Sequence, residues 1–180
     1  MNTKDPLSKN LTKKVALYGV FASLAMVMAV IERMFPIPIP VPGIKLGLAN
    51  VIVIIVLYAY STRSAFAINM LRITIVGLLL FGNMTSFAIS LAGGLLSFAA
   101  MVFAKKIKIF GLVGVSVIGG VFHNLGQIAV AAFIIQNINL IHAYTPILLV
   151  SGVITGVIIG FTAGYTLNNL KVIRMTGGFK

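Results

Sequence analysis

Residues Gly111–Ile135 read GLVGVSVIGGVFHNLGQIAVAAFII, an uncharged and mostly apolar stretch. A hydrocarbon core roughly 30 Å thick needs about 20 such residues to be crossed by a helix, so this stretch is long enough. Near its centre the pattern changes, because His123, Asn124 and Gln127 lie within two helical turns of one another. The stretch therefore predicts a membrane-spanning helix that carries a polar cluster.

The rest of the chain has the same character. It contains 180 residues, 59% of them hydrophobic, with a mean hydropathy of +1.10. We expect an all-α integral membrane protein with six transmembrane helices. The expected spans are roughly residues 15–35, 46–60, 65–81, 84–104, 111–135 and 144–166. The second and third are short for straight spans, so we expect tilted or partly broken helices there.

The spans define one membrane domain, residues 15–166, between an N-terminal tail, residues 1–14, and a C-terminal tail, residues 167–180. The first span is too long for a signal-peptide core, so we expect it to be retained. Between the first two spans, Pro36–Gly43 reads PIPIPVPG. Alternate prolines remove amide donors and favour extended backbone, which predicts a stiff, partly embedded loop.

Charge predicts the orientation. Fourteen basic residues face only two acidic ones, Asp5 and Glu32, for a net charge of +12. On a soluble domain this would suggest nucleic acid, but here the charges fall in tails and short loops, so we expect no nucleic-acid partner. In a six-span arrangement one side carries Lys4, Lys9, Lys13, Lys14, Arg63, Lys105, Lys106, Lys108, Lys171, Arg174 and Lys180. The other side carries only Arg33 and Lys45, which predicts a multi-pass cell-membrane protein with both termini in the cytoplasm.

Small residues four positions apart allow helices to approach closely. The last span carries the row Gly152, Gly156, Gly160 and Gly164, for which we expect packing within the chain. The first span carries Ala25 and Ala29, for which docking on a partner membrane protein is a live alternative.

Polar residues inside the spans form the predicted ligand site. Charged groups in a membrane span usually face protein or a water-filled cavity. The candidate substrate-binding residues are Lys45, Asn50, Asn69, Arg72, His123, Asn124 and Gln127. Arg72 and Lys45 have only Glu32 as a nearby carboxylate, and a buried cation without one requires carbonyls, water or an anionic ligand. We therefore expect a phosphate, diphosphate or carboxylate group, with Arg72 able to bind it through two hydrogen bonds.

Each of these residues also has a simpler interpretation. Arg72 could extend to an interface, His123 could bond a neighbouring helix, and Asn50 and Asn69 could link helices. Two histidines without nearby carboxylates make a metal site improbable, and the chain has no cysteine. It also lacks a nucleophile elbow or a nucleotide-binding loop, so we expect neither a cofactor nor enzymatic activity.

Four motifs, PGIKLGLANV, the span around Arg72, SLAGGLLS and SVIGGVFHNLGQ, resemble the membrane family called heptaprenyl diphosphate synthase component I, also labelled Gx transporter. The resemblance covers roughly residues 15–164. That family looks similar to the substrate-binding S components of energy-coupling factor (ECF) transporters. The resemblance implies a six-helix bundle, an outward-facing pocket with a lid at the proline loop, and docking of Ala25 and Ala29 on a coupling subunit.

Two functions follow as expectations. The first is an S-component-like transport subunit in the lipid bilayer, binding a small anionic or amphipathic solute, such as an isoprenoid- or quinone-related compound, and working with an ECF coupling subunit and its ATPases. The second is a noncatalytic membrane subunit that assists a soluble prenyl synthase in polyprenyl diphosphate or menaquinone biosynthesis. Prenyl synthases hold magnesium with paired aspartate-rich motifs, whereas this chain has one aspartate, Asp5.

Overall fold

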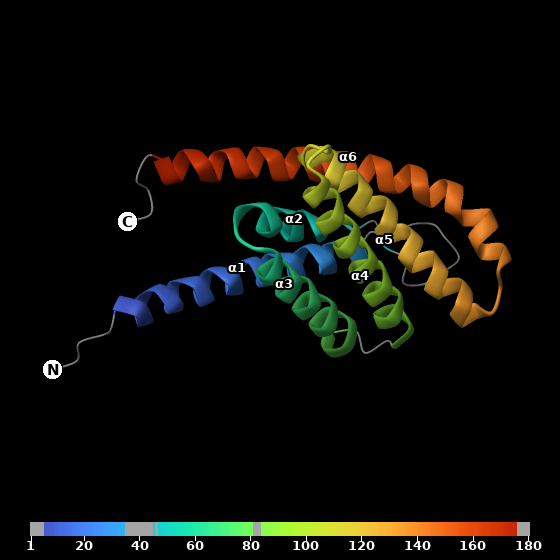
Figure 1. The fold of residues 1–180 in the computed structure, drawn as a ribbon. Helices are drawn as coiled ribbons and strands as arrows, with labels where there is room; N and C mark the ends of the chain where they lie inside the picture. The colour runs from blue at the N-terminus through green and yellow to red at the C-terminus, as the bar shows by residue number, and fades with distance from the viewer. Residues whose placement is uncertain (1–5, 35–44, 46, 81–83, 176–180) are drawn as a thin grey trace.

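The computed structural model describes residues 6–34, 45, 47–80 and 84–175, and within them it is helical and contains no strand (Figure 1). The helices are α1 (Pro6–Met34), α2 (Asn50–Ala59), α3 (Thr62–Thr74), the π-helix η1 (Ile75–Leu80), α4 (Met84–Ile107), α5 (Leu112–Ile135) and α6 (Asn139–Met175). Five segments in these described ranges are long and apolar enough to cross a membrane. The predicted all-α membrane bundle is confirmed, and its helices indicate a multi-pass membrane protein.

Helix α2 is shorter than the predicted span over residues 46–60. Its 10 residues rise about 15 Å, half the thickness of a hydrocarbon core. All residues from Asn50 to Leu57 are buried. A helix that is apolar on every side is stable when protein surrounds it. The count of six full spans is therefore approximate, since α2 is a half-length helix inside the bundle.

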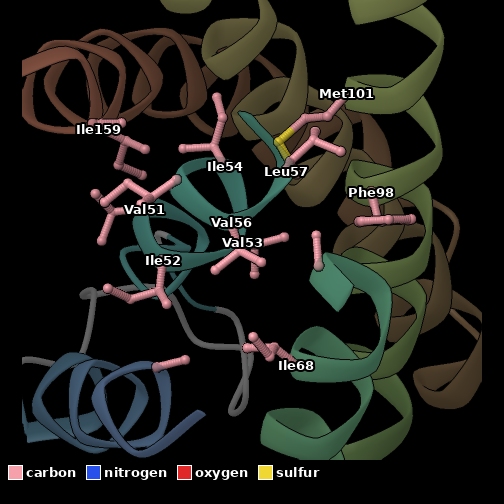
Figure 2. Close-up of a cluster of buried hydrophobic side chains, with 14 of the residues drawn as sticks. Val51, Ile52, Val53, Ile54, Val56, Leu57, Ile68, Phe98, Met101 and Ile159 are labelled. Carbon is pink, nitrogen blue, oxygen red and sulfur yellow. The ribbon is translucent and has the colours of Figure 1, made fainter. Parts of the chain in front are cut away.

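The main hydrophobic core surrounds α2. Figure 2 shows Ile54 and Leu57 beside Met101 of α4, and Val51 towards Ile159 of α6. Ile68 of α3 approaches the same cluster from another side. At the end of α2, Lys105 Nζ of α4 donates a hydrogen bond of 2.6 Å to the Leu57 carbonyl and lies 4.6 Å from the centre of the Tyr58 ring. This contact satisfies a carbonyl that the short helix leaves without an intrahelical donor.

The third predicted span, residues 65–81, consists of two kinds of helix. The α-helical part, α3, ends at Thr74, and η1 continues from Ile75 to Leu80. Short π-helical segments change the register of the side chains that follow, and they are frequent at functional sites. Arg72 lies in the last turn before this change.

Glycines bring α5 and α6 into close contact. A Cβ atom built on Gly156 would lie 2.5 Å from Val117 Cα, and one on Gly160 would lie 2.8 Å from Val113 Cα. Gly152 faces Gly120 at a similarly short distance, whereas Gly164 has an ordinary contact with Leu112. The predicted glycine row thus lies against α5, within the same chain.

Ala25 and Ala29 do not lie on a free surface of α1. Their side chains are 0% and 5% exposed, in hydrophobic clusters with α2 residues and, for Ala29, with Ala49 and Val76. The exposed face of α1 carries larger residues, among them Val20, Leu24 and Val27. The predicted docking surface is therefore not accessible in this structure, because small side chains let α1 approach the rest of the bundle.

The start of α1 and the end of α6 lie on the same side of the molecule, and the α5–α6 connection lies on the opposite side (Figure 1). The first and last helices extend into the predicted tails, since α1 begins at Pro6 and α6 ends at Met175. The predicted proline loop, Pro36–Gly43, lies outside the described residues.

Candidate functional site

A small cavity of about 20 Å³ lies between α1, α3, η1, α4, α5 and the segment before α2. Its polar lining residues are Glu32, Lys45, Arg72, Ser90, His123 and Gln127. Its apolar wall consists of Ala29, Ile73, Val76 and Gly77. Residues far apart in the sequence are thus brought together at one buried point, with the two predicted cations among them.

Arg72 is oriented by Asn69, and its buried Nε has no hydrogen-bond partner. The side chain is 5% exposed, and its Nη2 donates a hydrogen bond of 2.8 Å to Asn69 Oδ1. Asn69 Nδ2 donates in turn to the Gly94 carbonyl of α4 at 3.1 Å. Arg72 Nε has no hydrogen-bond partner. A buried guanidinium N–H without an acceptor is costly, so this group is available to a ligand or a water molecule.

Three helices hold the segment that leads into α2. The amides of Gly47 and Leu48 both donate to Glu32 Oε1 of α1, the second at 3.3 Å. Lys45 Nζ donates to Ser90 Oγ of α4 at 3.0 Å, and the Lys45 amide donates to Gln127 Oε1 of α5 at 3.0 Å. These bonds fix the Lys45 ammonium at the cavity.

Gly47 makes this geometry possible. Its φ of +85° lies in the left-handed region that side chains other than hydrogen disfavour. A Cβ atom there would also lie 3.0 Å from both Asn50 Nδ2 and His123 Cδ2. Only glycine fits this turn without displacing its neighbours.

The hydrogen bonds of Gln127 determine the tautomer of His123. Gln127 Oε1 accepts from the Lys45 amide, so the other end of this carboxamide is the donor Nε2. Gln127 Nε2 lies 3.0 Å from His123 Nε2, which must therefore be the acceptor. A neutral imidazole then carries its proton on Nδ1, an atom without a hydrogen-bond partner.

The structure separates the predicted site residues into three groups. Lys45, Arg72, His123 and Gln127 line the cavity, and Asn69 positions Arg72. Asn50, three residues after Gly47, donates from its Nδ2 to Ser97 Oγ of α4 at 3.5 Å. Asn124 faces α6, where its Nδ2 donates to the Leu148 carbonyl at 2.7 Å and to Ser151 Oγ at 3.1 Å. Asn124 therefore links helices and does not line the cavity.

Sequence reasoning did not assign Glu32 and Ser90 to the site. The sequence alone indicates Glu32 only as a possible counter-charge for Arg72 and Lys45. The signal for Glu32 was present, because it is the only acidic residue outside the N-terminal tail. No group of three or more His, Asp or Glu residues that could hold a metal ion occurs in the described part of the chain.

Fold and site together define a class: a multi-pass helical membrane protein with a buried cavity lined by two cations, one carboxylate and neutral polar groups. The chain belongs to the heptaprenyl diphosphate synthase component I family, whose sequence profile matches residues 21–166. Neither the curated proteins nor the solved structures contain a match to this chain.

Proposed function

We propose that this protein is the substrate-binding subunit of a transport system in the cell membrane, similar to an ECF S component, and that its substrate is a small anionic or amphipathic solute. The observation that carries the proposal is Arg72, a buried guanidinium whose Nε lies without a partner in a side chain that lines a cavity. An anion would supply the missing acceptor and compensate the cost of burying the cation.

The size of the cavity fits a closed form of such a site. A volume of about 20 Å³ corresponds to roughly one water molecule. A solute can enter only if the lining elements separate. Lys45, Gly47 and Leu48 contribute to this closure, and their hydrogen bonds to Glu32, Ser90 and Gln127 would be exchanged for contacts with the solute.

Energy for transport would come from partners. The sequence contains no nucleotide-binding loop, so this chain would act with a coupling subunit and ATPases. In this proposal the chain itself is not an enzyme. Two carboxylates in the entire sequence, one of them in the N-terminal tail, are too few for the paired magnesium sites of a prenyl synthase.

One observation favours a second candidate function. The family description names a component of heptaprenyl diphosphate synthase, which implies a partner synthase. In that role the protein would be a noncatalytic membrane subunit that holds a soluble prenyl synthase at the bilayer. Purification in mild detergent distinguishes the two, since one predicts an associated coupling module and the other an associated synthase.

The test of the anion site is Arg72→Gln. We expect this variant to bind acetate, inorganic phosphate and other small anions more weakly by about 1.5–3 kcal/mol, the range for hydrogen bonds to charged groups. Thermal unfolding should change less, because the substitution removes a buried cation. The control is Arg63→Gln, which removes an exposed arginine from the first turn of the same helix.

Isothermal titration and thermal unfolding are measured on the same purified samples. If Arg72→Gln lowers the unfolding temperature strongly while anion affinity equals that of wild type, Arg72 is structural and the proposed site is rejected. Equal weakening by Arg63→Gln would show that the chain binds anions through its overall charge.

A further inference from the structure

The charges around the cavity determine which anions it can accept. With Lys45 and Arg72 protonated and Glu32 ionised, the three described charged side chains that line the cavity sum to +1. The neighbouring segments outside the described residues, 35–44, 46 and 81–83, contain no Asp, Glu, Lys or Arg in the sequence. Arg33, which follows Glu32 on α1, is left out of this sum because its side chain lies outside the described part of the chain.

We propose that the cavity selects a solute with a single negative charge, a carboxylate or a phosphodiester, and that Glu32 is the specificity-determining residue that excludes phosphomonoesters and diphosphates. This inference rests on the proposed function, because it assigns the substrate class of the same site. It also separates the site from the diphosphate that the family name mentions.

Glu32 is fixed in place by its hydrogen bonds. It is 6% exposed, and its Oε1 accepts from the amides of both Gly47 and Leu48. Burial opposes the ionisation of Glu32, whereas two amide donors on one oxygen and the charges of Arg72 and Lys45 favour the carboxylate that this inference requires. Glu32 could leave the cavity only by releasing the turn that carries Lys45.

Charge balance then discriminates between solutes. A monoanion brings the sum of the four charged groups to zero, whereas a phosphomonoester dianion leaves −1 and a diphosphate leaves more. In a water-poor membrane interior an unbalanced charge interacts strongly and is poorly solvated, so each excess unit is costly. The Arg72 Nε–H supplies one directed donor for the single charged group of the solute.

The experiment uses two matched probes, dimethyl phosphate and methyl phosphate, which share a phosphoryl group. At about pH 7.5 the first is a monoanion and the second is mainly a dianion, since its second ionisation occurs near pH 6. Wild-type protein in detergent should bind dimethyl phosphate about tenfold more tightly than methyl phosphate, and inorganic pyrophosphate more weakly still.

The variant is Glu32→Gln, which retains a side-chain oxygen for the two amides but raises the charge sum to +2. It should reverse the order, so that methyl phosphate binds about tenfold more tightly than dimethyl phosphate. The matched control is Asp5→Asn, which removes the other carboxylate of the chain from the N-terminal tail and should retain the wild-type order.

The outcomes separate the inference from the proposed function. If the probes bind and depend on Arg72, but wild type prefers methyl phosphate or pyrophosphate, the monoanion inference is wrong and the anion site stands. The same conclusion follows if Glu32→Gln keeps the wild-type order. If neither probe binds and Arg72→Gln changes no anion affinity, both proposals are rejected. Should Glu32→Gln fail to fold, the order measured on wild type still tests the inference.

Discussion

Buried polar side chains in this protein orient one another through hydrogen bonds. Arg72 is oriented by Asn69, and His123 receives its tautomer from Gln127, which is itself fixed by the Lys45 amide. A substitution at one member would therefore change the donors and acceptors presented by another. Such coupling is expected where polar groups are buried together in a medium of low dielectric constant.

Part of this arrangement was predictable from the sequence. Polar and charged residues in or beside apolar spans usually face a protein interior, and Lys45, Arg72, His123 and Gln127 do line one cavity. Their predicted role in binding a substrate stays a prediction. Asn124 faces α6 and not the cavity, and this was not predictable from the sequence. The rotation of α5 about its axis determines whether each polar side chain faces α4 or α6. Glu32 was missed because its role depends on the backbone turn at Gly47, which composition does not reveal.

The Gly47 turn provides a stability test. Gly47→Ala should lower the free energy of unfolding by about 1–3 kcal/mol, since a side chain at a positive φ is strained and its Cβ would meet Asn50 and His123. Gly19→Ala is the control, because nothing lies within 4 Å of its added Cβ and alanine is the better helix former. Thermal unfolding in detergent measures both. Equal stability of the two variants would contradict the strained turn.

At the level of helices, apolar length predicted where the long segments lie but not how deeply each one crosses. The stretch over residues 46–60 is continuous in hydropathy, yet α2 begins only at Asn50. The preceding turn bends at Gly47 and directs its amides to Glu32, which prevents an earlier start of the helix. Hydropathy does not register such a turn. The change from α3 to η1 at Ile75 is likewise not visible in the hydropathy pattern.

The packing of α1 yields a prediction. Ala25→Leu should destabilise the protein by about 1–3 kcal/mol, because the alanine side chain is 0% exposed and the larger residue would overpack its cluster with α2. Val27→Leu on the exposed face of α1 should have little effect. Chemical or thermal unfolding compares them. If Ala25→Leu leaves the protein stable but prevents it from associating with a membrane partner, the result would support the predicted docking surface instead of internal packing.

The α5–α6 contact can be tested along its own glycine row. Gly156→Ala should cost about 1–3 kcal/mol, because its Cβ would lie 2.5 Å from the backbone of Val117 and the helices would have to separate. Gly164→Ala should be neutral or slightly stabilising, since its nearest contact, Leu112 Cδ2 at 3.4 Å, is a flexible side-chain atom. If the two variants unfold at the same temperature, the close approach of these helices is wrong.

For the whole molecule, topology depends on whether the short α2 counts as a crossing. In the described part of the chain five helices are long enough to span the bilayer, and five crossings would place the termini on opposite sides. Six passes would place them on the same side, which agrees with the start of α1 and the end of α6 lying on one side of the molecule (Figure 1). The lysines and arginines of the tails also favour a common cytoplasmic location. Helix α2 can complete a pass because protein surrounds it on all sides, so it need not match the bilayer thickness alone.

Single-cysteine labelling tests this topology directly, since the natural chain contains no cysteine. Cysteines placed singly at Thr3 and at Asn168 should react with a membrane-impermeant maleimide only after the cells are opened. A cysteine at Asn139, exposed at the start of α6, should react in intact cells. Reaction of Asn168→Cys but not Thr3→Cys in intact cells would indicate an odd number of crossings. That result would require α2 to return to the side from which it entered, which would also place Lys45 and Arg63 on the same side of the membrane.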